Sequence, residues 1–266
     1  RAASQLRGPA QAEWLDRLER EYANCRIAID TALGQARAQS PEGLVTAARL
    51  AIALHRLWLT RGPLLEGVEY LRRVTEAADD DALRDAVSDP LDIKLRAGLL
   101  SSAGQLANVR SVFPQAHDFF ARSLALHREA CDEAGVATTL NNLAWSAWIM
   151  GDMNAGEQMA TTAMRMHEKS SDALGATLSL NTLGWIAMER GQYSRAETYF
   201  ANAVTSHQQR GDRRAVAFTL GWTGILAARR GDLSRAIELH TQAIDMLEPV
   251  ADQGYRAYLR SHYNSL

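Results

Sequence analysis

Apolar and small residues recur along the chain at helical spacing. Leu140, Ala144 and Ala147 stand at i, i+4 and i+7, which is the buried stripe of an amphipathic helix. A glycine follows at Gly151, where its freedom to adopt the left-handed conformation suits a helix end. A second small-residue stripe begins at Gly156. The pattern therefore predicts two helices joined by a tight turn, a helical hairpin.

This hairpin recurs every 40 residues. The turn glycine returns as Gly191 and Gly231, and the block that starts at Ser111 has the same layout. Two core columns repeat with it: Leu100, Leu140, Leu180 and Leu220, and Gly104, Ala144, Gly184 and Gly224. One hairpin cannot cover its own apolar face, so the blocks must stack. We therefore predict an all-α solenoid whose four repeats occupy residues 97–256.

The small residues of each block decide between two kinds of helical repeat. Counted from Ala137 as position one, Ala144, Gly156 and Ala163 fall at positions eight, twenty and twenty-seven. This resembles the tetratricopeptide repeat, usually about 34 residues long, rather than a HEAT-like array of about 40–47 residues. The resemblance implies a right-handed superhelical solenoid. About six extra residues per repeat are expected to lengthen the helices and the loop between repeats.

The segments outside the four blocks differ from this plan. Residues 41–96 form a diverged hairpin with its turn at Gly62, and the acidic stretch from Asp79 to Pro90 reads as an extended loop. Residues 1–40 hold a tail and a capping helix from about Gln11 to Gly34. Residues 257–266 begin a further repeat, whose uncovered apolar face favours self-association. The chain starts at Arg1 rather than Met, so we expect it to be a piece of a longer protein.

The N-terminal part resembles a known junction. The resemblance rests on Glu13–Glu21, Ile27–Asp30, Leu57–Gly62 and Tyr70. They are similar to the start of the tetratricopeptide region in bacterial multidomain regulators of the signal-transducing ATPase (STAND) type, including LuxR-like and AfsR-like members. The resemblance implies an effector-sensing arm that partners a nucleotide-binding domain of the same protein and regulates transcription or signalling. This chain itself contains no G-x-x-x-x-G-K-S/T phosphate loop.

The resemblance also implies a ligand site. In tetratricopeptide solenoids, positions five, nine and twelve of each first helix line the concave groove. The groove positions singled out here are Ser101, Gln105, Asn108, Asn141, Trp145, Trp148, Asn181, Trp185 and Met188, joined by Arg56 from the diverged hairpin. Amide and indole groups suit a peptide, a protein segment or an amphiphilic small effector. Alternatively, the tryptophans pack between neighbouring first helices, and the sequence leaves both interpretations open.

Charge and composition narrow the class of protein. The 29 basic and 31 acidic residues give a net charge of −2, which argues against direct nucleic-acid binding. The 45 alanines favour helix. No apolar run is long enough to span a membrane. Cys25 and Cys131 are too few for a disulfide framework and suit a reducing, cytoplasmic compartment.

Catalytic and metal-binding chemistry is not expected. His127, His167 and His207 recur once per block, but stacked helices lie roughly 10 Å apart. Two zinc-bound nitrogens must approach within roughly 4 Å. No nucleophile elbow or metal motif is present, and no cofactor is expected. The sequence therefore predicts a non-catalytic binding domain that senses an effector; the alternative is a constitutive protein–protein adaptor without small-molecule input.

Overall fold

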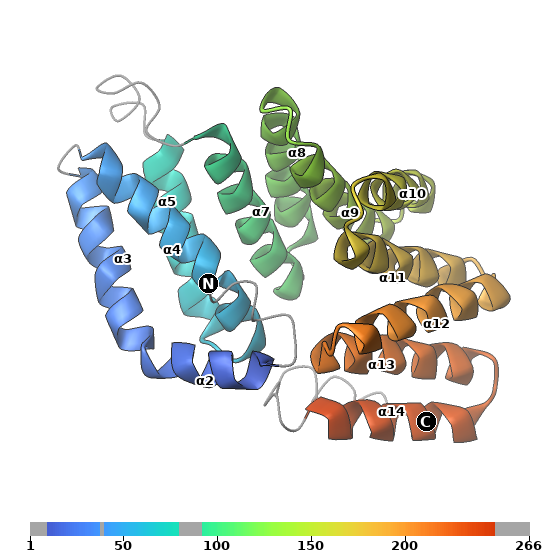
Figure 1. Cartoon of the computed structure of the whole chain (residues 1–266). Helices are drawn as coiled ribbons and strands as arrows, with labels where there is room; N and C mark the ends of the chain where they lie inside the picture. The colour runs from blue at the N-terminus through green and yellow to red at the C-terminus, as the bar shows by residue number, and fades with distance from the viewer. Residues whose placement is uncertain (1–9, 38–39, 80–91, 248–266) are drawn as a thin grey trace. The chain divides into compact units, whose positions relative to one another are not determined.

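The computed structural model describes residues 10–37, 40–79 and 92–247, and all regular structure in these ranges is helical (Figure 1). The contacts divide the chain into two compact units, Leu15–Ser146, and Ala147–Leu266 together with Arg1–Trp14. The all-α prediction is confirmed. No helix of the described ranges combines the length and hydropathy needed to cross a membrane.

Consecutive helices pair as antiparallel hairpins. Up to the division within α9 they are α2 (Gln11–Arg20), α3 (Tyr22–Arg37), α4 (Pro41–Thr60), α5 (Leu64–Asp79), α7 (Ile93–Val109), α8 (Phe113–Glu129) and α9 (Glu133–Ile149). They continue as α10 (Met153–Lys169), α11 (Ala173–Glu189), α12 (Tyr193–Gln209), α13 (Arg213–Arg229) and α14 (Leu233–Leu247). The hairpins α7/α8, α11/α12 and α13/α14 each pack closely, as does the diverged pair α4/α5.

The 40-residue period has a simple origin. Each helix from α7 to α13 has 17 residues, and three residues separate it from the next. Helix and link together repeat every 20 residues, so a hairpin repeats every 40. The extra length relative to a shorter tetratricopeptide repeat therefore lies in the helices. The expected longer loop between repeats is wrong, because both kinds of link are equally short.

Each link between these helices has a residue with positive φ, and all but the α7–α8 and α11–α12 links also have a capping side chain. In the α9–α10 link, Gly151 has φ +93° and the Asp152 N–H donates to the Ala147 carbonyl, as in a Schellman motif. The Asp152 side chain then accepts from the Ala155 N–H and caps α10. Gly191 and Gly231 adopt the same left-handed conformation, so the predicted glycine turns are confirmed.

The N-terminal segment is two helices rather than the single predicted one. The break falls at Glu21, and the helices on its two sides contact different side chains near the end of α4. Asp16 and Glu19 of α2 form ion pairs with Arg61 at the end of α4. Tyr22 of α3 accepts from the Trp58 indole at 2.9 Å.

Tyr22 also links α3 to α5. Its hydroxyl donates to Glu66 at 3.0 Å. Burial, together with the nearby Glu66 carboxylate, raises the pKa of Tyr22 to about 12. The hydroxyl of Tyr22 thus connects α3 to both α4 and α5.

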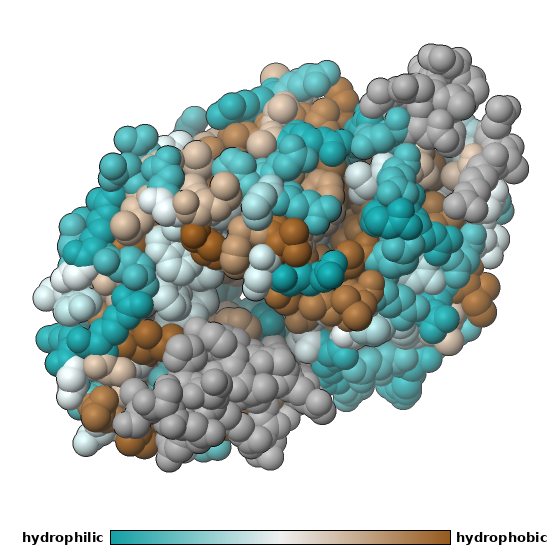
Figure 2. All heavy atoms as spheres, turned by 180° about the vertical axis from the view of Figure 1, so that it is seen from behind, coloured by the Kyte–Doolittle hydropathy of each residue, from teal (hydrophilic) through white to brown (hydrophobic). Residues whose placement is uncertain are grey.

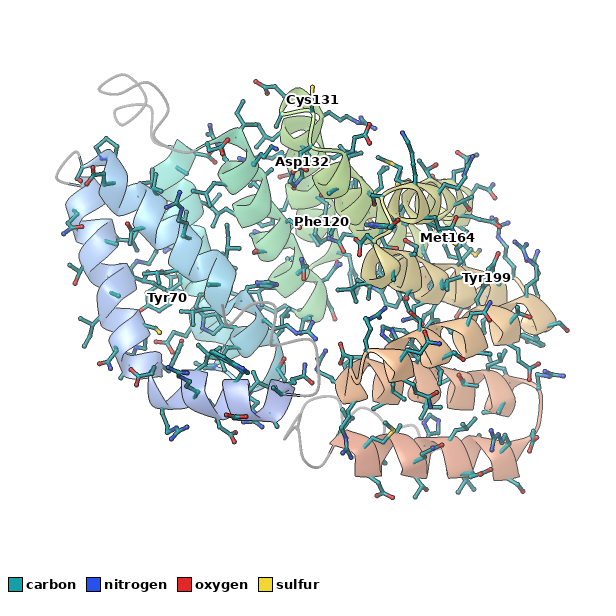
Figure 3. All side chains as sticks on the ribbon, viewed as in Figure 1. Tyr70, Phe120, Cys131, Asp132, Met164 and Tyr199 are labelled. Carbon is teal, nitrogen blue, oxygen red and sulfur yellow. The ribbon has the colours of Figure 1, made fainter. Side chains whose placement is uncertain are left out.

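Two phenylalanines fill the space that glycines leave in the hairpins. Phe120 and Phe200 are fully buried, and a Cβ placed on Gly104 or Gly184 would lie 2.6 or 2.5 Å from the facing ring. Figure 3 shows Phe120 among the side chains of α7 and α8. The missing Cβ therefore sets how closely first and second helices approach. The small-residue columns of the sequence mark these contacts.

Asp79 connects three helices of the first unit. Its carboxylate accepts from Arg96 of α7 and Arg122 of α8, each at 2.8 Å. Burial acts to raise the pKa of Asp79, but the two guanidinium groups outweigh it and the pKa is lowered. The acidic stretch that follows, and the predicted further repeat at 257–266, lie outside the described residues. The proposed boundaries at residues 40, 96 and 256 stay predictions.

Replacing Gly184 by alanine should lower the free energy of unfolding by about 1–3 kcal/mol, because the new methyl group overlaps the buried Phe200 ring. Urea unfolding measures this change. Gly34→Ala is the matched control, since a Cβ at Gly34 of α3 meets nothing within 4 Å. It should stabilise the helix by about 0.5–1 kcal/mol. Equal effects at the two glycines would contradict the packing role of Gly184.

Replacing Asp79 by asparagine should lower the free energy of unfolding by about 1 kcal/mol at pH 7. This value allows for solvent screening, because Asp79 and its two arginine partners are partly exposed. A carboxyl with a lowered folded pKa stabilises the fold above its unfolded pKa of about 3.9, and that contribution is lost as the pH falls through the folded pKa. The difference in free energy of unfolding between wild type and Asp79→Asn, measured with urea, should therefore shrink between about pH 5 and pH 3. A gap that stays constant over this range would exclude the ion-pair account.

Candidate functional site

The predicted groove positions on α7 and α9 are mostly half-buried. Gln105 and Asn108 of α7 and Asn141 and Trp145 of α9 retain part of their surface, whereas Ser101 is buried. The side-chain oxygen of Asn108 is itself buried and has no hydrogen-bond partner among the described residues, so only the rest of this side chain is accessible. These side chains can therefore contribute to a polar and aromatic surface. Arg56 of α4 is also half-buried.

The groove positions on α11 are not available. Asn181, Trp185 and Met188 are 5%, 7% and 1% exposed. The reason is packing, because α10, α12 and α13 all lie against α11. The expectation that these three side chains present an open binding surface is therefore corrected.

Indole rings form a continuous row across successive first helices. Trp148 lies against Trp185 with ring centroids 5.2 Å apart, and Trp185 meets Trp222 edge-on at 6.0 Å. Phe200 of α12 lies 6.3 Å from Trp222. For Trp148 and Trp185 the structure thus matches the alternative in which tryptophans pack between neighbouring first helices. Trp222 was not among the predicted positions.

Asn181 is a buried link between helices. Its amide lies 3.4 Å from Nε2 of His207 on α12 and 3.3 Å from Oγ1 of Thr219 on α13. Arg210 lies 2.9 Å from the other ring nitrogen, Nδ1. A guanidinium can only donate, so Nδ1 must accept and the ring proton belongs on Nε2. The amide oxygen of Asn181 can accept that proton while its nitrogen donates to Thr219, an orientation that the heavy-atom positions permit.

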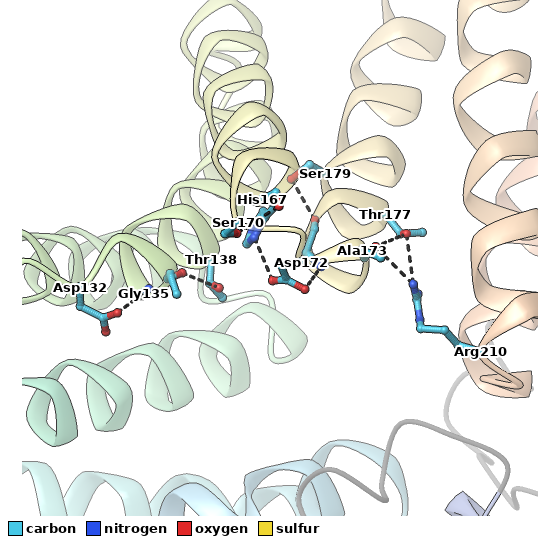
Figure 4. A network of polar contacts seen from close by, with 12 residues as sticks. Asp132, Gly135, Thr138, His167, Ser170, Asp172, Ala173, Thr177, Ser179 and Arg210 are labelled. Carbon is cyan, nitrogen blue, oxygen red and sulfur yellow. Dashed lines mark hydrogen bonds and ion pairs between the residues drawn. The ribbon is translucent and has the colours of Figure 1, made fainter.

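Arg210 extends this network to the start of α11. Its guanidinium donates to the Ala173 carbonyl at 3.2 Å (Figure 4). It also donates to the Ser206 hydroxyl at 3.0 Å. Ser206 is in turn 2.6 Å from the Thr177 hydroxyl. Arg210, His207 and Asn181 together hold α11, α12 and α13 in one register.

Two of the recurring histidines, His127 and His167, fasten a second helix to the next first helix. His127 lies 2.9 Å from Asp132, and His167 lies 3.0 Å from Asp172. Each of these aspartates caps the following helix through the N–H of a glycine (Figure 4). A Cβ on that glycine would lie about 2 Å from the imidazole, 2.0 Å at Gly135. The histidine column is thus explained by helix packing.

Cys131 and groups of possible metal ligands are the remaining candidates for site chemistry. Cys131 is exposed at the tip of the α8–α9 turn (Figure 3), where it adopts φ +50°. Within the described ranges, no three His, Cys, Asp or Glu side chains gather in a way that could hold a metal ion.

The accessible part of the second unit's first helices lies nearer their N-termini than predicted. Leu174 and Leu178 of α11, and Arg214 and Phe218 of α13, are half-buried. Each pair is four residues apart, and so within about 40° of one helix face. Part of the signal was present in the sequence, because Leu178 and Phe218 occupy the column where the preceding block has Thr138. The family positions five, nine and twelve lie further along each first helix and did not include this column.

The sequence comparison assigns part of the chain to a repeat family. Residues 174–248, which cover α11 to α14 almost completely, match the family model described as a tetratricopeptide repeat. No curated protein matches the chain in sequence.

Solved structures extend the likeness to the whole fold. BtubC (BKLC) from P. vanneervenii has a TM-score of 0.62 and 18% identity, over 94% of this chain and 93% of its own. The apo form of RapI has a TM-score of 0.56 and 12% identity, over 91% and 95%. NprR in complex with its cognate peptide NprX has a TM-score of 0.66 and 15% identity, over 95% of this chain and 64% of NprR. The chain therefore folds as a tetratricopeptide-repeat domain and spans about two thirds of NprR.

Replacing Asn181 by alanine should lower the free energy of unfolding by about 1–3 kcal/mol, because it leaves buried polar groups of His207 and Thr219 without this partner. Thermal or urea unfolding measures the loss. Asn202→Ala, an exposed asparagine on α12, is the matched control and should change stability by less than about 0.5 kcal/mol. An Asn181→Ala protein as stable as the control would refute the structural role.

Proposed function

We propose that this chain is a non-catalytic binding domain whose first helices take a peptide or protein segment. The observation that carries the proposal is the fold shared with NprR, whose structure holds its cognate peptide NprX. Gln105, Asn108, Asn141 and Trp145 supply a half-buried surface of amides and an indole on α7 and α9. Such groups suit a peptide, whose backbone offers donors and acceptors at regular intervals.

We further propose that the domain senses an effector in a bacterial cytoplasmic regulator. In this proposal, the ligand controls a nucleotide-binding domain elsewhere in the same protein. A ligand can do so only by binding one conformational state more tightly than another. The STAND-like residues of the N-terminal segment support this arrangement, and NprR is itself described as a quorum sensor from B. thuringiensis.

A constitutive adaptor is the second candidate. The observation in its favour is the likeness to BtubC, because this chain covers 93% of the length of that structure. An adaptor would hold a protein partner without a small-molecule input. Pull-down from the native host and a thermal-shift screen of metabolites separate the two roles. A captured partner with no stabilising metabolite supports the adaptor, whereas stabilisation by an effector supports the sensor.

A random peptide library displayed on phage and selected on the whole chain should yield binding peptides. Trp145→Ala should weaken the best peptide at least tenfold in fluorescence anisotropy, since buried tryptophans are common binding hot spots worth about 2 kcal/mol or more. Asn202→Ala on the second helix α12 is the control and should bind normally. A library that yields no binder, or binders insensitive to Trp145→Ala at unchanged fold stability, would overturn the proposed surface.

A further inference from the structure

Two cations of the first unit stand on neighbouring first helices. Arg49 of α4 and Lys94 of α7 are exposed, and neither side chain has an ion pair or a hydrogen bond with a described residue. Apolar side chains lie between polar ones on the face of the molecule shown in Figure 2, so exposed apolar atoms alone do not mark a binding surface. A pair of cations without acidic partners is a more specific signal.

A missing side chain leaves part of Ile52 accessible beside these cations. A Cβ on Gly98 of α7 would lie 3.5 Å from Cδ1 of Ile52 on α4, an ordinary contact distance, and both residues are half-buried. The later blocks carry Thr138, Leu178 and Phe218 in the column of Gly98. This block alone of the four therefore has no side chain to cover Ile52.

Arg49 and Lys94 lie on the same side of the contact between Ile52 and Gly98. Helices α4 and α7 pack together and run in the same direction (Figure 1). Seen along the axes, Arg49 is turned by about 60° from Ile52, and Lys94 by about 40° in the opposite sense from Gly98. Each cation also stands about one helical turn before its neighbour in the contact. The two side chains therefore flank the space over Ile52 at one level.

The acidic residues nearest to these cations in sequence are engaged or distant. Asp92 accepts from the Lys94 N–H at 3.3 Å and caps α7. Glu42 is seven residues before Arg49, which places it about 10 Å away along α4. A ligand carboxylate between a guanidinium and an ammonium group can form charge-assisted hydrogen bonds with both, whereas a basic ligand would be repelled.

We propose that a peptide lying across α7 and α4 places an acidic side chain between Arg49 and Lys94 and a neighbouring aliphatic side chain on Ile52, over Gly98. Gln105 is eleven residues after Lys94 and within about 20° of it on α7, so this site continues the amide surface of the proposed function. The inference rests on that peptide-binding function and adds the charge and the size of one part of the ligand.

The first test compares the peptides that different forms of the whole chain select from one random phage library. The forms are the wild type, Arg49→Gln/Lys94→Gln, and the control Arg128→Gln/Lys169→Gln, which removes the same charge from exposed positions on the second helices α8 and α10. Wild type and control should enrich aspartate and glutamate about twofold over the Arg49→Gln/Lys94→Gln form. Equal acidic content in the three pools would overturn the inference.

The second test measures the charge preference in solution. The best wild-type peptide, and twins in which each acidic residue in turn becomes glutamine, are labelled with fluorescein and titrated with the whole chain. One twin should bind the wild type about tenfold more weakly, a difference of about 1.4 kcal/mol. The same twin should differ less than about twofold on Arg49→Gln/Lys94→Gln, and raising the salt from about 50 mM to about 500 mM should shrink the wild-type preference.

Filling the space over Ile52 tests the aliphatic part of the site. Gly98→Leu introduces the residue that the repeat carries at Leu178, and it should weaken the best peptide about tenfold because it occupies that space. Leucine favours a helix more than glycine does, so the variant should unfold at the same or a higher temperature. Gly98→Ala, with a smaller side chain, is the milder second variant. Undiminished binding by both variants would contradict the placement on Ile52.

The outcomes separate this inference from the function on which it rests. Selected peptides that depend on Trp145 but show no acidic preference overturn the site at Arg49 and Lys94 and leave peptide binding intact. A library that yields no binder on the wild type overturns the proposed function, and this site with it.

Discussion

The three-residue link between consecutive helices is the constraint on which the rest of the structure depends. A link this short leaves room for one left-handed residue and one capping residue, so the second helix must reverse direction and lie against the first. The facing surfaces then have to accommodate a close approach. Gly104 and Gly184 do so by receiving Phe120 and Phe200 where a Cβ would overlap. The aspartates that close the links also give His127 and His167 their partners.

Packing between successive hairpins then decides which side chains can meet a ligand. Helix α11 has neighbours on three sides, which buries Asn181, Trp185 and Met188. Near the N-termini of α11 and α13 the side chains are less enclosed, and Leu178 and Phe218 keep part of their surface. Polar groups inside the stack, such as Asn181, are used to fix register between helices. The same residue type therefore has different roles at Asn108 and Asn181.

The sequence predicts the fold better than it predicts the site. Columns such as Leu140 and Leu180 report a periodicity that a stacked helical structure must obey, and turn glycines such as Gly191 report a local conformation. Both signals are short-range. The burial of Trp185 depends instead on three helices that approach it from elsewhere in the chain, and no spacing within α11 encodes that. The contacts of α2 with Arg61 and of α3 with Trp58 likewise join residues about 40 positions apart in the sequence.

The spacing of the touching tryptophans differs from the 40-residue repeat of the chain. Duplication of a 40-residue block copies a side chain to the position 40 residues later, as Trp145 and Trp185 are related. The rings that touch, Trp148, Trp185 and Trp222, are instead 37 residues apart, so each stands almost one helical turn earlier than its predecessor. The touching rings therefore occupy a different position in each repeat. The contact between neighbouring first helices is made by aromatic side chains that the 40-residue repeat does not place in one column.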